Sequence, residues 1–383
     1  MPKIYLDYVS ATPLHPEVRE AMRPFLEERF GNPASLHLYG LQARDALKEA
    51  REKIARFINA PSPDEIVFTS DGTEAMNLAV KGVAWANRER GNHIVASAIE
   101  HPGVLRSLEF LETQGFECTR VPVDSVGRVS PESIREALTD QTILVASHFA
   151  NHDLGTIQPI KELSMITREA GVPLYVDAES AAGWKAVDLQ DLGADLLSLS
   201  PHRFYGPKGV GVLWRSGRVP IQSLIHGGEQ EHGLRGGVEN VAAITGAGTA
   251  AELMSADETT LGVLQRGLWL GIKSALPDVH LNGPEPDEGR NRMVNVLNVS
   301  FSGTEGEGVA LASDMRGLVI ASGPACRGKA LRTSPTLKAL GLEDDLARAN
   351  VLLSLGRETT SEEVAAAAKL LAQVVERLRA MDR

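Results

Sequence analysis

Residues that could do chemistry follow several strand-like segments of this chain. In "FTSDGTEAMNLAVKG", Gly72 and Thr73 stand where a helix is predicted to begin after a strand. Backbone N–H groups and the helix dipole at such a point can hold a phosphate, although the same pattern also fits an ordinary helix cap. Asp177, in "YVDAES", can pair with the protonated nitrogen of an aromatic ring or simply close a turn. His101, in "IEHPGV", can stack on such a ring or be structural.

A further segment, "SLSPHRFYGPKG", combines an anion-binding pattern with an arginine. Strand-like residues lead into Ser200, His202 and Arg203, and a Gly-Pro-Lys-Gly turn follows. The guanidinium of Arg203 stays protonated, so it can bind an anion but cannot act as an amine nucleophile. Two arrangements of Arg203 are open. It binds a phosphate, a sulfate or a phosphorylated ligand, or it folds back onto Asp177 as an internal ion pair.

The elements that must position these residues alternate along the chain. The runs "IVFTS", "HIVASA", "ILVASH", "PLYVDA" and "DLLSLS" are almost continuously apolar, as in buried parallel strands, and helical patterns lie between them. This alternation predicts a doubly wound α/β sheet. Ligands of such sheets bind beyond the carboxyl ends of the strands. We therefore expect convergence of the clusters that follow the strands, which are 71–73, His101, Asn151, Asp177 and 200–203.

The chain changes character after about residue 250, where long amphipathic helices replace the strands. The last helix is predicted to open with a capping box at 360–363, "TSEE". We therefore expect a large α/β domain over 13–255 and a smaller α+β domain formed by 1–12 and 256–383.

Composition narrows the possible partners. The chain has 383 residues and a formal net charge of -11, which argues against a nucleic-acid or anionic membrane surface as the main partner. No uninterrupted apolar run approaches the length of a membrane span, and the N-terminus lacks a signal-peptide pattern. Cys118 and Cys326 are far apart, so we expect no metal site and no disulfide framework, and we predict a cytoplasmic protein.

Nine segments in register resemble the cysteine desulfurases, in the class V aminotransferase branch of the fold-type I enzymes that use pyridoxal phosphate (PLP). The segments are "YLDYVSATPLHPEV", "GNPASLHLYG", "FTSDGTEAMNLAVKG", "ASAIEHPGVL", "ANHDLGTIQPI", "YVDAESAAG", "SPHRFYGPKGVGVLW", "GGEQEHGLRGGVENVAA" and "ASGPACRGKALRTSPTLKALGL". The resemblance implies a mostly parallel seven-stranded-type sheet between helices, with a smaller α+β domain. It also implies a homodimer in which 226–240 reaches the neighbouring subunit's site.

The resemblance assigns a role to each site residue. Gly72 and Thr73, with Ser200 and His202, would bind the cofactor phosphate. His101 would stack on the ring, Asp177 would pair with its nitrogen, and Asn151 would lie near its hydroxyl. Cys326 matches the mobile cysteine that accepts sulfur as a persulfide. Arg327 and Lys329 beside it would favour the thiolate.

Four positions depart from the family pattern. Arg203 stands where the family carries the Schiff-base lysine, and Leu352 stands where it carries the arginine that clamps the substrate carboxylate. Ser180 replaces a glutamine expected at the ring hydroxyl, and Val238 replaces a threonine that reaches the neighbouring subunit's phosphate. Nothing in the spacing recommends another lysine, such as 185, 208 or 329, as a substitute.

These departures leave three functional hypotheses. In the first, the protein has diverged from PLP-dependent desulfuration and serves in sulfur handling as a binding or partner subunit, alongside a sulfur acceptor or a desulfurase, with Cys326 as a possible persulfide site. In the second, it binds PLP or another phosphorylated ligand noncovalently, not as an internal aldimine, with His202 or His101 as the base. In the third, it is an active desulfurase that recruits another amine.

Overall fold

The computed structural model describes residues 3–254, 258–287, 290–323 and 333–381. Its central feature is a seven-stranded sheet in the order β2-β8-β7-β6-β5-β3-β4. The strands are β2 (Ile66–Thr69), β3 (His93–Ser97), β4 (Glu117–Val121), β5 (Thr142–His148), β6 (Leu174–Asp177), β7 (Leu196–Leu199) and β8 (Gly211–Arg215). The predicted mostly parallel α/β sheet is confirmed, since β4, β3, β5, β6 and β7 pair in parallel.

The strand β2 lies differently from the other predicted strands. It is fully buried, yet its neighbour is β8, with which it pairs antiparallel. The strand β8 also pairs antiparallel with β7, which directly precedes it in the sheet-forming part of the chain. The expectation that "IVFTS" pairs as a parallel strand is therefore wrong. Burial on both faces makes a strand continuously apolar whichever way its neighbour runs.

Successive residues of a strand face opposite sides of the sheet, so these apolar strands give the sheet two hydrophobic faces. A layer of helices covers each face. Ile94 and Ala96 of β3 join one hydrophobic cluster with Val104 and Leu108, whereas Val95 joins the other. The first face carries α3 (Gly72–Asn77), a π-helical turn (Leu78–Gly82), α4 (Val83–Ala86) and α5 (Pro102–Glu112). The second carries α2 (Leu38–Phe57), α6 (Pro131–Ala137), α7 (Ile160–Ala170), α8 (Leu189–Leu192) and α9 (Val241–Leu253), with α1 (Pro16–Glu27) against α9.

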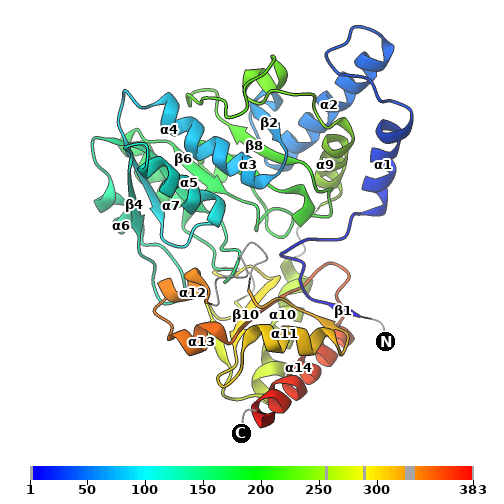
Figure 1. Cartoon of the computed structure of the whole chain (residues 1–383), viewed down its shortest axis with the longest axis vertical. Coiled ribbons are helices and arrows are strands. Elements are labelled where there is room, and N and C mark those ends of the chain that lie inside the picture. Colours follow the sequence, from blue (N-terminus) through cyan, green and yellow to red (C-terminus); the bar gives the residue numbers. More distant parts are fainter. Residues whose placement is uncertain (1–2, 255–257, 288–289, 324–332, 382–383) are drawn as a thin grey trace.

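A smaller sheet lies in the lower part of Figure 1, among the yellow to red helices. Its antiparallel order is β12-β10-β9, from β9 (His280–Asn282), β10 (Val296–Ser300) and β12 (Asn350–Ser354). Beside it β1 (Ile4–Tyr5) pairs in parallel with β11 (Leu318–Val319). The helices here are α10 (Glu258–Ala275), α11 (Gly306–Asp314), α12 (Pro335–Ala339), α13 (Asp344–Arg348) and α14 (Ser361–Met381). The domain limits at 12/13 and 255/256 stay predictions.

The start of α14 shows how local sequence fixes an element. The Thr360 N–H donates to Glu363 Oε2 at 3.0 Å, and the Glu363 N–H donates to Thr360 Oγ1 at 3.2 Å. This reciprocal pair satisfies two helix-terminal N–H groups. The predicted capping box is confirmed. Within the described residues, no helix is long and apolar enough to span a membrane.

Candidate functional site

The side chains predicted to converge do lie together at the carboxyl ends of the strands. The carboxylate of Glu179, two residues beyond Asp177, packs against Gly72 and close to the Ser200 hydroxyl. Arg203 lies within 3.9 Å of the same carboxylate. The His101 ring packs edge-on against the ring of His152, next to Asn151, with 5.2 Å between centroids. The first contacts join the segments that follow β2, β6 and β7, and the last joins the segments that follow β3 and β5.

Arg203 is held by the protein itself. One guanidinium N–H donates to the Val9 carbonyl at 3.0 Å and to Ser180 Oγ at 3.4 Å. Its Nε lies 3.9 Å from Glu179 Oε2, and no hydrogen-bond acceptor within the described residues satisfies that Nε. The carboxylate within ion-pair distance of Arg203 is therefore that of Glu179. This differs from the expected ion pair with Asp177, and the expected binding of an anion by Arg203 stays a prediction.

Glu179 is the site residue that sequence analysis missed. A Cβ atom placed on Gly72 would lie only 1.7 Å from Glu179 Oε1 and 2.2 Å from Ser200 Oγ. The carboxylate therefore fills the space directly in front of Gly72, at the start of the helical segment 72–86. The Ser200 hydroxyl is the polar side-chain group beside this carboxylate, and its hydrogen bonding lowers the pKa of Glu179 somewhat against the larger effect of burial. The available signal was "DAES" itself, because a second acid follows Asp177 at the end of a buried strand.

Asp177 and Glu179 form a buried pair of carboxylates. Asp177 accepts the Glu179 N–H at 2.9 Å, and the two side chains are only 5% and 4% exposed. Burial raises the pKa of Asp177 to about 6, and the Glu179 N–H and Arg203 oppose the rise. Burial, followed by the charge of Asp177, raises the pKa of Glu179 to about 8. At neutral pH the pair therefore holds fewer than two full negative charges.

His101 begins α5 and caps it. Its Nδ1 accepts the Gly103 N–H at 3.0 Å, which leaves Nε2 to carry the proton of the neutral ring. Burial, followed by the charges of Arg203 and His148, lowers the pKa of His101 to about 3. His101 is thus neutral at pH 7 and a weak base. The predicted stacking role stays a prediction, and the low pKa does not favour the role of general base.

His202 and Thr73 lie at the edges of the same region. Burial, then Arg203 and Lys208, lower the pKa of His202 to about 4, so its imidazole is also neutral at pH 7. Its carbonyl accepts hydrogen bonds from the N–H and hydroxyl of Thr12. Thr73 is exposed in this single chain. The adjacent Asp71 is an ordinary N-cap, since its side chain accepts the Glu74 N–H at 2.7 Å.

Asn151 is fully buried and serves a turn. Its Oδ1 accepts the N–H groups of Asp153 and Leu154, and its Nδ2 donates to the Ile99 carbonyl at 3.1 Å. The first two bonds close the turn after β5, and the bond to Ile99 ties that turn to the segment after β3. They account for the residue structurally, while the predicted place near a ring hydroxyl remains untested.

A buried ion pair behind His101 also escaped sequence analysis. His148 Nδ1 lies 2.8 Å from Glu100 Oε1, and both side chains are almost completely buried. The Ser97 hydroxyl donates to the same oxygen at 2.6 Å. Burial is the largest single influence and lowers the pKa of His148, but the charge and hydrogen bond of Glu100, together with the charge of Asp177, outweigh it, so the net shift is upward. The pair stiffens the carboxyl ends of β3 and β5.

The remaining predicted positions are placed as follows. Cys326, Arg327 and Lys329 lie outside the described residues. Leu352 is fully buried in β12, and Val238 is 58% exposed in the single chain. The amine of Lys185 lies 2.9 Å from Glu258, and Lys208 is exposed in its turn. Within the described residues, no group of three His, Cys, Asp or Glu side chains could hold a metal ion.

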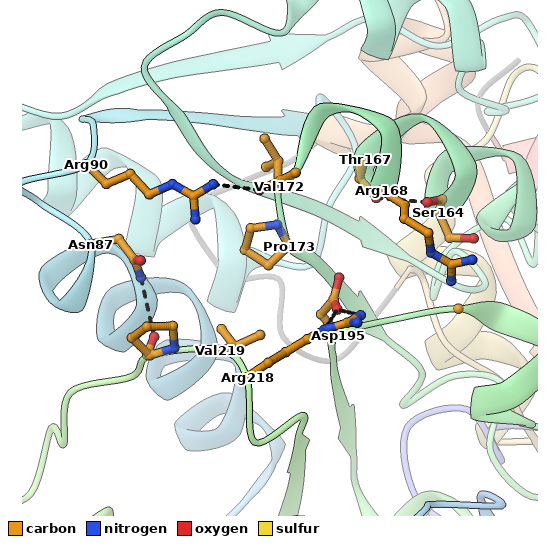
Figure 2. Close-up of a pocket in the computed structure, with 13 residues that line it drawn as sticks. Asn87, Arg90, Ser164, Thr167, Arg168, Val172, Pro173, Asp195, Arg218 and Val219 are labelled. Atoms are coloured by element: carbon orange, nitrogen blue, oxygen red, sulfur yellow. Dashed lines mark hydrogen bonds and ion pairs between the residues drawn. The ribbon is translucent and has the colours of Figure 1, made fainter.

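A separate cavity of about 270 Å³ lies at the opposite edge of the sheet, where β6 and β7 begin (Figure 2). Two of its three arginines donate hydrogen bonds to neighbouring residues. Arg90 donates to the Gly171 carbonyl at 2.8 Å, and Arg218 donates to Asp195 at 3.0 Å. This cavity shares no lining residue with the predicted site.

Comparison with known proteins identifies the family. The model of the family described as aminotransferase class-V matches residues 4–366. A curated relative named cysteine desulfurase IscS, from Dictyoglomus turgidum, is 44% identical over 381 residues, which cover 98% of this chain and 95% of the relative. The chain belongs to the aminotransferase class-V family, among the cysteine desulfurases.

Other relatives agree with this assignment. The cysteine desulfurase IscS of Methanosarcina thermophila is 43% identical to this chain, and the match covers 99% of this chain and 93% of the relative. A solved structure titled NifS-like protein is 33% identical, with a TM-score of 0.90, and the match covers 98% of this chain and 100% of that one. The predicted family resemblance is confirmed.

Members of this family use PLP, so the site residues must be compared with that cofactor. The resemblance assigns Asp177 to the ring nitrogen and His101 to the ring face, and a buried carboxylate and a neutral imidazole are chemically suited to those roles. At Gly72, which the resemblance assigns to the phosphate, the Glu179 carboxylate fills the space that a Cβ would take, and this leaves little room for a phosphate there. The resemblance also places Arg203 where the family carries its Schiff-base lysine, and a guanidinium forms no Schiff base. If the resemblance assigns these two positions correctly, the described residues do not suit PLP in the family's usual arrangement.

Proposed function

We propose that this protein of the cysteine desulfurase family is a dimeric binding or partner subunit in sulfur handling and does not itself carry out ordinary PLP-dependent desulfuration of cysteine. The observation that carries the proposal is Arg203, at the position that the family resemblance assigns to the Schiff-base lysine. Its guanidinium is anchored by the Val9 carbonyl and Ser180 and approaches Glu179. A charged, anchored guanidinium supplies no amine nucleophile.

Loss of the substrate clamp supports the same proposal. Leu352 stands at the position of the arginine that would bind the substrate carboxylate, and it packs completely inside the hydrophobic core. A charge-assisted contact of that kind contributes roughly 1.5–3 kcal/mol to binding. Free cysteine would therefore bind weakly even if another amine replaced the lysine.

Cys326 gives the partner role a definite chemistry. Its thiolate would attack the terminal sulfur of a persulfide on a partner protein. The partner's cysteine then leaves as a thiolate, and the sulfur remains on Cys326 as a new persulfide. The exchange needs no added oxidant or reductant. Cys118 provides a matched control, because burial raises the pKa of its thiol to about 11 and makes it unreactive.

Exposed apolar side chains support the dimer. Phe30, Leu36 and Leu38 are 75%, 86% and 66% exposed in the single chain, and Val238 is 58% exposed. Apolar exposure concentrated in one segment is typical of an interface. These positions lie in 30–38, which links α1 to α2, and in the segment expected to reach a neighbouring subunit.

An ordinary desulfurase is the second candidate, and the names of the relatives favour it. Purified protein incubated with PLP and cysteine separates the two candidates. We expect no Schiff-base absorption band and no sulfide release. In a mixture with an active desulfurase and cysteine, we expect mass spectrometry to find a persulfide on wild type and on Cys118→Ser, but not on Cys326→Ser. Sulfide release by the protein alone at a rate typical of the family would overturn the proposal.

A further inference from the structure

Four residues define where a ligand phosphate would lie if this chain followed its family. They are Gly72, Thr73, Ser200 and His202, and the structure does bring Gly72 and Ser200 face to face. The space between those two residues is nevertheless not free. Both Glu179 Oε1 and Ser200 Oγ lie within 2.2 Å of the point that a Cβ on Gly72 would take.

Glu179 is fixed in this place from two sides. Its own N–H is bonded to Asp177 Oδ1, which sets the direction in which its side chain leaves the backbone. Its Oε2 faces the Nε of Arg203 at 3.9 Å. Moving the carboxylate away to admit a ligand would separate it from Arg203, its cationic neighbour inside this buried cluster. The carboxylate is thus an internal occupant of the phosphate position.

The charges around this position disfavour an added dianion. Asp177 lies on the same side, and the imidazoles of His101 and His202 are neutral at pH 7. Arg203 is already directed toward Glu179. At pH 7 a phosphate would therefore meet the negative charge of Asp177 and the space that Glu179 already fills, and both oppose its binding in a buried site.

We propose that the carboxylate of Glu179 occupies the phosphate position of this pocket and selects against phosphorylated ligands, so that the pocket takes an unphosphorylated aromatic ring. The proposal deepens the proposed function, since it concerns the same pocket. It rests on Glu179 and not on Arg203, so the two proposals can fail separately.

The test uses two probes that differ only in the phosphate, pyridoxine and pyridoxine 5′-phosphate. Neither carries an aldehyde, so neither reacts with surface lysines. Dissociation constants are measured by titration calorimetry for wild type, Glu179→Gln and Glu179→Ala. We expect wild type to bind the phosphorylated probe no more tightly than pyridoxine. We expect Glu179→Ala to bind it at least about tenfold more tightly than wild type does, with pyridoxine affinity changed less than about threefold.

The Glu179→Gln variant separates charge from volume. If both variants bind pyridoxine 5′-phosphate more tightly than wild type, the charge of Glu179 causes the selection. If only Glu179→Ala does, the space that the side chain fills causes it. Either result supports the proposal. Glu162→Ala, at an exposed position of α7, is the matched control and should behave as wild type. Circular dichroism and thermal melts establish that each variant is folded, and Glu179→Gln keeps the test decisive if Glu179→Ala does not fold.

Three outcomes would overturn the proposal. The first is a wild-type preference of tenfold or more for the phosphorylated probe. The second is an unchanged ratio of the two affinities in both folded variants, and the third is no binding of either probe to any variant. A wild type that prefers the phosphorylated probe yet releases no sulfide would contradict this proposal and leave the proposed function intact.

Discussion

The Arg203 guanidinium Nε faces Glu179 Oε2 at 3.9 Å, inside a cluster whose two side chains are 13% and 6% exposed. Arg203 is therefore the cation that compensates a buried pair of carboxylates, Asp177 and Glu179. By the family resemblance, Arg203 stands where an amine is expected. Its hydrogen bond to the Val9 carbonyl links it to the segment between β1 and α1.

Removal of Arg203 should destabilise the protein. Arg203→Ala leaves the Asp177 and Glu179 carboxylates without their cation, and breaking a buried pair costs about 3 kcal/mol at the lower end of measured values. We expect this loss in denaturant melts at pH 8.5 and a smaller loss at pH 5.5, where the carboxylates take up protons instead. The double variant Arg203→Ala, Glu179→Gln should recover part of the stability. An equal loss at both pH values would contradict the ion-pair explanation.

Stability should depend on pH through Glu179. Its folded-state pKa is raised to about 8, above the ordinary value of 4.5. The folded state therefore binds more protons than the unfolded state between those two values, and stability falls as pH rises through this window. We expect Glu179→Gln to melt a few degrees above wild type at pH 8.5 and close to it at pH 5. A Glu179→Gln curve parallel to that of wild type across the whole range would count against a raised pKa.

Restoring the lysine alone should not restore cofactor binding. A lysine at position 203 would face Glu179 and Asp177, which keep the amine protonated, and the phosphate position would still be filled. We expect Arg203→Lys incubated with PLP to show no Schiff-base band, and Arg203→Lys, Glu179→Ala to show one. Turnover of cysteine should stay low in both, because Leu352 supplies no clamp. A full band in Arg203→Lys alone would show that Glu179 does not block the site.

The protein should be a homodimer at micromolar concentration. Phe30 and Tyr39 stack with 5.4 Å between ring centroids, and with Leu36 and Leu38 they form an exposed apolar segment. We expect sedimentation equilibrium to give the dimer mass for wild type and a weakened dimer for Leu36→Asp. Leu311→Asp, at a 70% exposed position of α11, is the control and should remain dimeric. A monomeric wild type would contradict the prediction.

The capping box of α14 should contribute measurably to stability. Thr360→Ala removes the acceptor of the Glu363 N–H and, with it, one half of a reciprocal pair. Loss of such a cap costs about 1 kcal/mol. Denaturant melts of Thr360→Ala and of Thr360→Ser should show this loss in the first variant and near-wild-type stability in the second.

Sequence by itself determined the family, the strand segments and their order along the chain. Local chemistry was sufficient there, because a buried strand must be continuously apolar and a helix start must satisfy its N–H groups. The sequence also showed that Arg203 lies just before the Gly-Pro-Lys-Gly turn, at the place where the family resemblance expects a lysine. It further predicted which strand ends converge. Sequence did not predict the antiparallel pairing of β2 with β8, because burial on both faces gives the same pattern in either direction.

Only the tertiary structure decided what the converging residues do. The sequence placed Asp177 and Glu179 two residues apart, but only the fold brought the Glu179 carboxylate into the space between Gly72 and Ser200. The low basicity of His101 and His202 likewise comes from burial and from the nearby charge of Arg203. Side-chain direction and desolvation depend on neighbours that are distant along the chain, so no local pattern carries them.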